Sequence, residues 1–419
     1  MNKRLNPAEL TGVIQAIPSK SHAHRLLIAQ KITDLQGEPA PKRFKVPAFS
    51  KDVKATMDCL KHLDDEVPLL DCGESASTLR FLMPLAMLLK ERVVFRGAGK
   101  LPERPLDPFI KQMGKHGCTF NMSMEIDKET SATREICEIT GRLKGGNFRI
   151  PGDVSSQFIT GLMFALPLMK RKSNIILTTP LESAGYVNMT LSVLKEFGVT
   201  VNVEETDDGL PKYVIPGRQV FREPLTQYLD GDWSNAAFWL ACGALGQGVT
   251  VKGLSMISNQ PDMAIMDILA SMGADIYRDI DYVTARNNGR LRAMDIDVSQ
   301  IPDLMPVLAV LMSVADGVSM ITGAERLKLK ESNRLKAICD NLNALGADVT
   351  YGGNSLSITG VPRLAGGTVD SLGDHRIAMA MAVASTVCDG KVTIRNADAV
   401  SKSYPGFFKD FTKLSKNKR

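Results

Sequence analysis

A glycine recurs along the chain at the point where an apolar, helix-like segment gives way to a short segment of alternating polarity. It stands at Gly117, Gly198, Gly273 and Gly346, so the intervals are 81, 75 and 73 residues. Glycine readily adopts the left-handed conformation that closes many helices before the chain turns into a strand. The near-constant interval predicts β/α units stacked within and across two domains. Ordinary capping of unrelated helices is the alternative interpretation, because glycine commonly follows helices.

Length and composition also favour two α/β domains. A chain of 419 residues, 44% of them hydrophobic, exceeds what one core usually organises. Residues 228–232 form a polar break, and we expect a helix directly after it. The N-terminal segment is too short to fold alone, so we expect it to add a strand to the second domain. The first domain then spans 19–229 and the second 1–18 plus 230–419, and the chain crosses between them twice.

Several classes of function are disfavoured. The net charge of +5 is mild and basic residues are not interleaved with aromatic ones, so we expect no nucleic-acid partner. No apolar stretch reaches the roughly 18 residues of a membrane span, and no signal peptide is recognisable. The seven cysteines include no C-x-x-C pair and the five histidines no zinc-binding pattern, which predicts a cytoplasmic protein with reduced thiols and no metal site. Neither a P-loop nor a dinucleotide fingerprint occurs, so we expect no cofactor.

Polar, often cationic residues stand where several apolar helices are expected to begin. Three of these starts carry cations, at residues 18–21, 330–334 and 373–376, and two carry hydroxyl groups, at 75–78 and 153–157. A helix N-terminus offers free backbone N–H groups and the positive end of the helix dipole, and both attract anions. Several such starts in one chain predict a cleft that binds more than one small polyanion.

The charged residues at these starts admit a chemical or a structural interpretation. Lys20 and Arg25 together are suited to bind a phosphate and a carboxylate. A serine that only caps the helix, with both cations exposed to solvent, explains the same residues equally well. Lys330 and Arg334 are four residues apart, which places them on one helical face beside Glu331. This face is either an exposed, salt-bridged surface or a proton donor held close to a charged substrate.

Two aspartates also stand where helices are expected to begin. Asp303 lies between prolines in an apolar setting, where it either caps the following helix or acts as a general base. Asp374 is expected to cap the helix that begins beside it.

In their order along the chain, these motifs resemble those of the 5-enolpyruvylshikimate-3-phosphate synthase family of enolpyruvyl transferases. The resemblance runs from Pro18 to Pro405. Its most specific pieces are Ser19-Lys20-Ser21 with Arg25, Lys330-Glu331-Ser332-Asn333-Arg334 and Asp374-His375-Arg376. It implies an α/β fold of two similar domains, each built from three βαβαββ repeats and joined by a two-stranded hinge. The active site is then expected in the interdomain cleft.

The resemblance also implies a reaction and its residues. The family transfers the enolpyruvyl group of phosphoenolpyruvate to the 5-hydroxyl of shikimate 3-phosphate and releases phosphate, without a metal or cofactor. The first domain is expected to hold mainly shikimate 3-phosphate, and the second mainly phosphoenolpyruvate and the catalytic acids. The residues implied for shikimate 3-phosphate are Lys20, Ser21, Arg25, Ser155, Ser156, Gln157, Ser183, Tyr186, Asp303, Arg326 and Lys330. Those implied for phosphoenolpyruvate are Lys20, Ala76, Arg104, Gln157, Arg334, His375, Arg376 and Lys402. Asp303 is implied to take the proton of the attacking hydroxyl, while Glu331, together with Lys20, protonates the methylene carbon.

Two positions depart from the family's pattern. Asn333 stands where the family often has Asp, which alters a supporting contact. Ala76 stands where the family commonly has Gly close to phosphoenolpyruvate, so its methyl group narrows the pocket. Because glyphosate is longer than phosphoenolpyruvate in the family's binding mode, we hypothesise that this enzyme tolerates glyphosate.

Two other functions stay open on the sequence. The related enolpyruvyl transferase acts on UDP-N-acetylglucosamine, but its usual catalytic-loop cysteine has no clear counterpart near Arg104. A non-catalytic polyanion-binding protein needs the cations but has no use for Glu331 and Asp303, and its binding would fall steeply with salt. Our expectation is a cytoplasmic monomer that acts on two small molecules, without a nucleic-acid or membrane partner.

Overall fold

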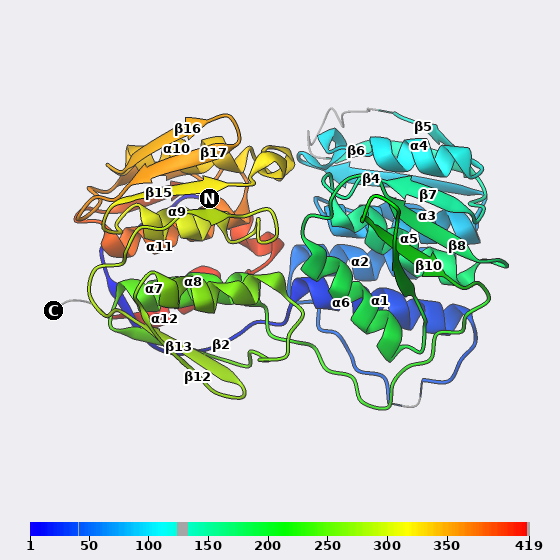
Figure 1. The fold of residues 1–419 in the computed structure, drawn as a ribbon, viewed down its shortest axis with the longest axis horizontal. Coiled ribbons are helices and arrows are strands. Elements are labelled where there is room, and N and C mark those ends of the chain that lie inside the picture. The colour runs from blue at the N-terminus through cyan, green and yellow to red at the C-terminus, as the bar shows by residue number, and fades with distance from the viewer. Residues whose placement is uncertain (41, 124–132, 417–419) are drawn as a thin grey trace. The chain divides into compact units, whose positions relative to one another are not determined.

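The computed structural model describes residues 1–40, 42–123 and 133–416 (Figure 1). The chain folds into two compact units. Lys20–Leu229 forms one, which we name the inserted unit, because the chain enters and leaves it from the other. The second unit consists of Met1–Ser19 and Asp230–Arg419, and we name it the terminal unit.

The two segments of the terminal unit that adjoin the inserted unit in the sequence are paired through their backbones. The N–H of Ser19 donates to the carbonyl oxygen of Asp230 at 2.7 Å, and the N–H of Asp232 donates to that of Ile17 at 2.8 Å. The N-terminal segment adds strands to the terminal unit, as expected, because β1 (Lys3–Leu5) and β2 (Glu9–Gln15) pair with strands from the C-terminal half.

The described part of the inserted unit contains two four-stranded sheets, ordered β3-β4-β6-β5 and β7-β8-β10-β9. Its helices are α1 (Lys20–Leu35), α2 (Lys51–His62), α3 (Ala76–Leu89), α4 (Asp107–Lys115), α5 (Ser156–Ala165) and α6 (Ala184–Glu196), with 3-10 turns η1 (Leu101–Glu103) and η2 (Leu166–Leu168). Its strands are β3 (Leu69–Asp71), β4 (Arg92–Ala98), β5 (Cys118–Asn121), β6 (Thr133–Gly141), β7 (Asn147–Ile150), β8 (Ser173–Leu177), β9 (Asn202–Glu205) and β10 (Pro211–Ile215).

The described part of the terminal unit contains three sheets, ordered β12-β13-β11-β2-β20, β14-β15-β17-β16 and β1-β19-β18. Its helices are α7 (Trp233–Leu245), α8 (Ile265–Ser271), α9 (Met305–Met312), α10 (Arg334–Ala344), α11 (His375–Ala384) and α12 (Phe407–Leu414), with 3-10 turns η3 (Pro261–Ala264), η4 (Glu325–Leu329), η5 (Ser385–Val387) and η6 (Ala397–Lys402). Its other strands are β11 (Gly248–Lys252), β12 (Asp275–Arg278), β13 (Tyr282–Arg286), β14 (Ile296–Asp297), β15 (Val318–Thr322), β16 (Asp348–Gly352), β17 (Ser355–Thr359), β18 (Gly367–Asp370), β19 (Val392–Arg395) and β20 (Ser415–Lys416).

One supersecondary unit recurs in both halves of the chain. The order βαβαββ runs through β3 to β6, β7 to β10 and β14 to β17, and in each the first two strands are parallel while the rest pair antiparallel. A fourth copy joins β2 to β11, β12 and β13 with the same pairing, although the inserted unit separates β2 from the rest. The expected α/β class and internal repeat are confirmed. The repetition is not fully regular, because among the described residues no strand lies between α1 and α2 or between α2 and β3.

The recurring glycines lie where the sequence predicted, between a helix and the next strand. Gly117, Gly198, Gly273 and Gly346 have φ of +96°, +76°, +102° and +91°. They follow α4, α6, α8 and α10, each of which ends two residues before its glycine. The left-handed conformation is therefore required at each of these helix ends.

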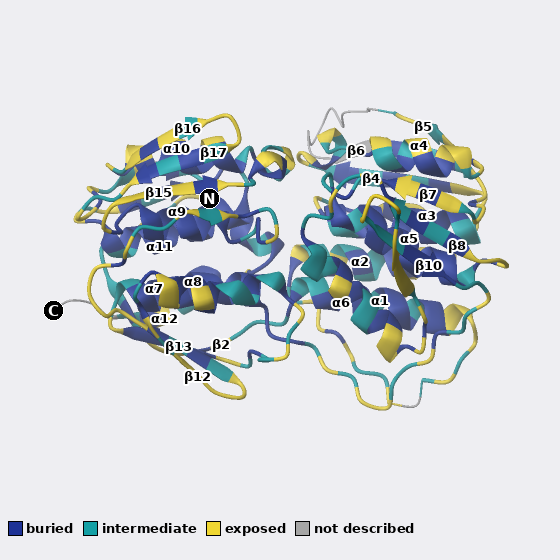
Figure 2. Ribbon diagram, viewed as in Figure 1, coloured by how far each residue is buried: buried dark blue, intermediate teal, exposed yellow. Residues whose placement is uncertain are grey.

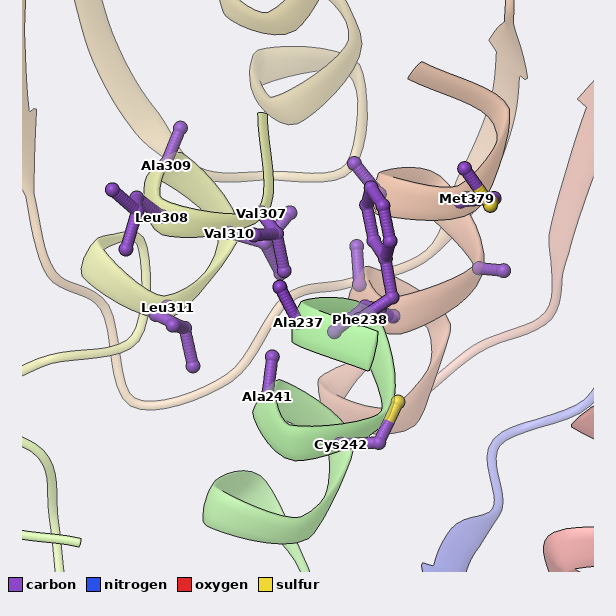
Figure 3. Packing of buried hydrophobic residues seen from close by; sticks show 14 of the residues in the cluster. Ala237, Phe238, Ala241, Cys242, Val307, Leu308, Ala309, Val310, Leu311 and Met379 are labelled. Carbon is purple, nitrogen blue, oxygen red and sulfur yellow. The ribbon is translucent and has the colours of Figure 1, made fainter. Parts of the chain in front are cut away.

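Two central helices of the terminal unit are buried on all sides, whereas the strand β15 is buried on one face. Every residue of α9 and α11 is buried, while β15 alternates between exposed and buried positions (Figure 2). A helix that is apolar all round belongs in a core, whereas an alternating strand has one face in water. In the terminal unit the small side chains of Ala237 and Ala241 on α7 lie on the side that faces α9 (Figure 3). Each unit has its own hydrophobic core, and no helix in the described ranges is both long and apolar enough to cross a membrane.

The contact between α3 and α5 is close enough to require a glycine. A Cβ on Gly161 would lie 2.2 Å from the carbonyl oxygen of Arg80 and 3.3 Å from Cα of Phe81. We therefore expect Gly161→Ala to destabilise the protein by about 1–3 kcal/mol, the usual cost of overpacking a core. Gly114→Ala is the matched control, because a Cβ there meets no atom within 4 Å and alanine is the better helix former. Urea unfolding of both variants checks this, and equal midpoints would contradict it.

Candidate active site

The charged residues of the terminal unit gather around one buried arginine, Arg334. Its Nε donates to Asp374 Oδ2 at 2.8 Å, its Nη1 to Asp303 Oδ1 at 2.9 Å and its Nη2 to Glu331 Oε2 at 2.9 Å. The side chain of Arg334 is 1% exposed. Burial disfavours the charged form, but Asp374, Glu331 and Asp303 outweigh it and raise the pKa of Arg334. The guanidinium thus orders three carboxylates from three separate segments of the chain.

Asp303 is the most heavily paired of these carboxylates. Its Oδ2 accepts from Arg376 Nη2 at 2.9 Å, and Lys330 Nζ lies 3.8 Å from its Oδ1. Although burial opposes ionisation, Arg376, Lys330 and Arg334 hold the pKa of Asp303 well below 3.8. Burial lowers the pKa of Lys330 to about 8, against the opposing effect of Asp303. Asp303 is therefore ionised at neutral pH, while Lys330 lies close to its titration point.

Two local interpretations of the sequence are wrong. Asp303 does not cap α9, because the cap position belongs to Leu304 and carries no side-chain hydrogen bond; the carboxylate is drawn into the ion pairs instead. Lys330 and Arg334 do not share a helical face, because Lys330 directly follows η4 and α10 begins only at Arg334. They meet at Asp303 through a bend in the chain, which the four-residue spacing did not reveal.

The start of α11 completes this cluster. Asp374 caps the helix as expected, accepting from the N–H of Arg376 at 2.9 Å, and also accepts from Ser332 Oγ at 3.1 Å. Lys402 Nζ donates to the carbonyl oxygen of Gly373 at 2.7 Å, so this cation lies at the same helix start. The side chain of His375, the first residue of α11, is buried. Arg326 is anchored separately, through its Nη2, to the carbonyl oxygen of Ser299 at 2.9 Å.

In the inserted unit the residues predicted on α1 are held by two different arrangements. Lys20, the first residue of α1, pairs with Asp52 at 2.7 Å. Arg25 is buried and donates to the carbonyl oxygens of Ser21 at 2.6 Å and Tyr186 at 2.8 Å, and to Thr190 Oγ1 at 2.9 Å. Burial lowers the pKa of Arg25 to about 9, so it remains charged at neutral pH.

A second buried arginine, Arg80, organises the other predicted residues of this unit. It donates to Ser155 Oγ at 3.3 Å, to Gln157 Oε1 at 3.0 Å and to the carbonyl oxygen of Pro105, the neighbour of Arg104, at 2.8 Å. Its guanidinium also lies 4.8 Å from the ring centre of Phe158. The starts of α3 and α5 and the loop that carries Arg104 are thereby tied together.

The remaining predicted residues lie at helix starts. Ser155 caps α5, and Ser156 is its first residue. Ser183 precedes α6 with φ of +55°, a conformation that is uncommon outside glycine and that clusters at functional sites. Ala76 is the first residue of α3 and is 4% exposed.

Sequence reasoning missed two charged residues of this arrangement, Asp52 and Arg80. Asp52 lies in the first turn of α2 and Arg80 in the second turn of an apolar helix. An arginine inside an otherwise apolar helix is costly unless it is paired, and that signal was available for Arg80. Nothing local distinguished Asp52 from an ordinary acidic residue at a helix start.

The arrangement can bind anions and move protons. Each unit presents cations and hydroxyl groups at helix starts, and the terminal unit adds carboxylates that are paired with cations. No group of three or more His, Cys, Asp or Glu side chains in the described ranges is placed to hold a metal ion. Together, the fold and these sites define a two-domain α/β enzyme that acts on small polyanions.

Comparison with known proteins identifies the family. Residues 64–411 match the family model described as EPSP synthase (3-phosphoshikimate 1-carboxyvinyltransferase). The chain is 41% identical to the 3-phosphoshikimate 1-carboxyvinyltransferase of Clostridium kluyveri, over 98% of this chain and 96% of that protein. It is 39% identical to the enzyme of that name from Clostridium perfringens, over 98% and 97%. The solved structure of EPSP synthase from Acinetobacter baumannii has the same fold, with a TM-score of 0.75 at 21% identity, covering 99% of this chain and 98% of that one. The chain belongs to the EPSP synthase family.

The ion pairs of Asp303 make a testable contribution to stability. Asp303→Asn leaves Arg334, Arg376 and Lys330 facing a neutral amide. We therefore expect the free energy of unfolding at pH 7 to fall by an amount on the order of 3 kcal/mol. Because the pKa of Asp303 is lowered in the folded state, its contribution is fully present above pH 3.8 and is lost as the pH falls below that value. The deficit of the variant should therefore be constant from pH 7 to 5 and narrow below pH 3.8.

Urea unfolding at several pH values measures this deficit. Asp316→Asn is the control, because the side chain of Asp316 is 71% exposed and pairs with Arg290 at 3.1 Å on the surface, where ion pairs contribute little. A deficit for Asp303→Asn that is no larger than that of the control would refute the assignment.

Proposed function

We propose that the protein transfers the enolpyruvyl group of phosphoenolpyruvate to the 5-hydroxyl of shikimate 3-phosphate and releases phosphate. The observation that carries this proposal is the shared position of Asp303 and Glu331 on the buried Arg334, beside Arg376 and Lys330. Phosphate and carboxylate groups on both substrates account for the cations. Proton transfer accounts for the two acids, which a protein that only binds anions does not need.

The substrate groups can be assigned to the helix starts of each unit. Shikimate 3-phosphate is assigned to the inserted unit through Ser21, Arg25, Ser155, Ser156, Gln157, Ser183 and Tyr186, with Lys330, Arg326 and Asp303 from the terminal unit. Phosphoenolpyruvate is assigned to Arg334, His375, Arg376 and Lys402 of the terminal unit, with Lys20, Ala76, Arg104 and Gln157 from the inserted unit. Fixed cations at helix starts neutralise the phosphates without a metal ion. All seven cysteines are buried and form no disulfide, which fits the proposed reducing cytoplasm.

Asp303 is proposed as the base for the attacking hydroxyl. In the unliganded protein its low pKa makes it a weak base, because three cations stabilise its charge. When anionic substrates engage Arg334, Arg376 and Lys330, their stabilisation of Asp303 decreases and its pKa rises. Substrate binding thereby brings the base closer to the pKa that favours proton transfer near neutral pH.

Glu331 and Lys20 are proposed for the proton transfers at the methylene carbon. In the first step the 5-hydroxyl oxygen bonds to C2 of phosphoenolpyruvate, the hydroxyl proton passes to Asp303, and the methylene carbon gains a proton from Glu331 or Lys20. A tetrahedral intermediate results. In the second step the carbon returns a proton, the C2–O bond to phosphate breaks, and the enol ether forms. Fixed charges stabilise the intermediate without reorganising.

Phosphate release tests the proposed function directly. We expect the wild-type protein to release phosphate from phosphoenolpyruvate with shikimate 3-phosphate as acceptor and not with UDP-N-acetylglucosamine. Glu331→Gln should lower kcat by about 100- to 10,000-fold, the range for loss of a general acid or base. Glu325→Gln, an exposed position in η4, is the control and should retain kcat.

The opposite outcomes are equally informative. Release only with the nucleotide sugar would assign the protein to the related transferase. No release with either acceptor from a folded sample would leave a polyanion-binding protein without catalytic activity.

The methyl group of Ala76 yields the glyphosate prediction. Ala76 begins α3 and is almost fully buried, so its methyl group occupies space that a glycine leaves open. We expect Ala76→Gly to lower the glyphosate concentration for half inhibition by about tenfold or more, since filling a close contact can cost 1–3 kcal/mol. The KM for phosphoenolpyruvate should change much less. Inhibition curves at equal saturation with phosphoenolpyruvate check this, and coincident curves for the two proteins would contradict it.

A further inference from the structure

Three helices of the inserted unit are joined near their N-termini by buried polar side chains. α1 carries Lys20 and His24, α2 carries Asp52 and Thr56, and α3 carries Thr78 in its first turn. α1 contacts α2, and α2 contacts α3. Lys20 pairs with Asp52 at 2.7 Å, and the carbonyl oxygen of Asp52 lies 3.5 Å from Thr78 Oγ1.

A continuous chain of hydrogen bonds runs through these helices to the cap of α3. His24 Nδ1 lies 2.7 Å from Thr56 Oγ1, Thr56 Oγ1 lies 2.6 Å from Thr78 Oγ1, and Thr78 Oγ1 donates to Ser75 Oγ at 2.7 Å. A hydroxyl has a single proton to donate. Thr78 must therefore accept from Thr56, and Thr56 must accept from the Nδ1–H of His24. We name these four residues the hydroxyl relay.

The surroundings of His24 keep the relay in this one direction. Its ring is fully buried, and its Nε2 has no hydrogen-bond partner among the residues that the structure describes. Burial, with Lys20 and Arg25 nearby, lowers the pKa of His24 well below 6.5. The imidazole is therefore neutral, with its proton on Nδ1, and its ring lies nearly perpendicular to that of Phe81, with 6.2 Å between the ring centres.

The relay ends at the turn to which phosphoenolpyruvate is assigned. Ser75 Oγ accepts from both Oγ1 and the backbone N–H of Thr78, the latter at 3.2 Å. The O–H of Ser75 is therefore not used in its bonds with Thr78. Ala76 follows directly, and Ser77 Oγ accepts from Gln157 Nε2 at 3.0 Å.

We propose that the hydroxyl relay fixes the turn of Ser75, Ala76 and Ser77 in the orientation that binds phosphoenolpyruvate, with Thr56 as its central positioning residue. This inference rests on the proposed function. Thr56 acts through Thr78 and Ser75 and does not contact substrate. The relay makes the geometry of an anion-binding helix start depend on a histidine and two hydroxyl groups buried behind it.

Removal of one hydroxyl tests the relay. Thr56→Val keeps the shape of the side chain but breaks the chain of hydrogen bonds, so we expect the KM for phosphoenolpyruvate to rise about five- to tenfold, as loss of about one hydrogen bond implies. The kcat and the KM for shikimate 3-phosphate should stay close to those of the wild type. Thr56→Ser keeps the hydroxyl and should restore the wild-type KM.

Thr33→Val is the matched control. Thr33 is a fully buried threonine of α1 whose hydroxyl donates only locally, to the carbonyl oxygen of Ala29 at 3.0 Å. Its substitution should lower thermal stability without changing either KM. Thr78→Val removes the next hydroxyl of the relay and should reproduce the effect of Thr56→Val, which keeps the proposal testable if one variant fails to fold.

The outcomes separate this inference from the function on which it rests. Absence of enolpyruvyl transfer by the wild-type protein would overturn the proposed function, and the relay's role with it. Transfer by the wild type, with the same KM for phosphoenolpyruvate in Thr56→Val, Thr78→Val and Thr33→Val, would overturn the relay alone. A Thr56→Ser variant that behaves like Thr56→Val would also overturn it, because packing and not the hydroxyl would then be responsible.

Discussion

The structure depends on helices that are buried on every side. Because α9 and α11 have no solvent-facing side, the polar ends of such helices are the places where charge and hydrogen-bonding groups can gather. The first backbone N–H groups of each helix need acceptors, and the dipole favours anions beside them. Asp374, Ser75 and Ser155 meet part of this need as caps. The sheets, with one face in water, contribute little to the site.

Charge balance then decides what these helix starts can do. In the terminal unit, three cations (Arg334, Arg376 and Lys330) pair with three carboxylates (Asp303, Glu331 and Asp374), so each carboxylate is held by cations that also attract anions. Arg334 illustrates this, since it orders Asp303, Glu331 and Asp374 and is itself assigned to phosphoenolpyruvate. A substrate that competes for these cations changes the pKa of the acids they hold. We therefore propose that binding and proton transfer both depend on this one ion-pair network. In the inserted unit, Arg80 donates to a hydroxyl, an amide oxygen and a backbone carbonyl, and His24 bonds to a hydroxyl.

The sequence was informative where local patterns have local causes. The recurring glycines predicted helix ends, because only a residue without a side chain closes a helix cheaply in the left-handed conformation. The expectation that Asp374 caps a helix was also correct. Spacing failed where the chain bends, since Lys330 and Arg334 meet at Asp303 without sharing a helix. The partners of Asp303, Lys20 and Arg80 come from distant segments, so no local pattern identifies them. The residue roles taken from the family resemblance stay predictions.

In the proposed reaction, acids held among cations move the protons as the acceptor adds to phosphoenolpyruvate and phosphate is then eliminated. The most direct measurement is the deuterium content of the product's methylene group after a single turnover in D2O, read by proton NMR. Addition converts the methylene carbon to a methyl group, and elimination removes one of its three hydrogens. The addition–elimination mechanism therefore predicts deuterium in the enolpyruvyl group of the product. A product whose methylene group retains only protons would contradict it.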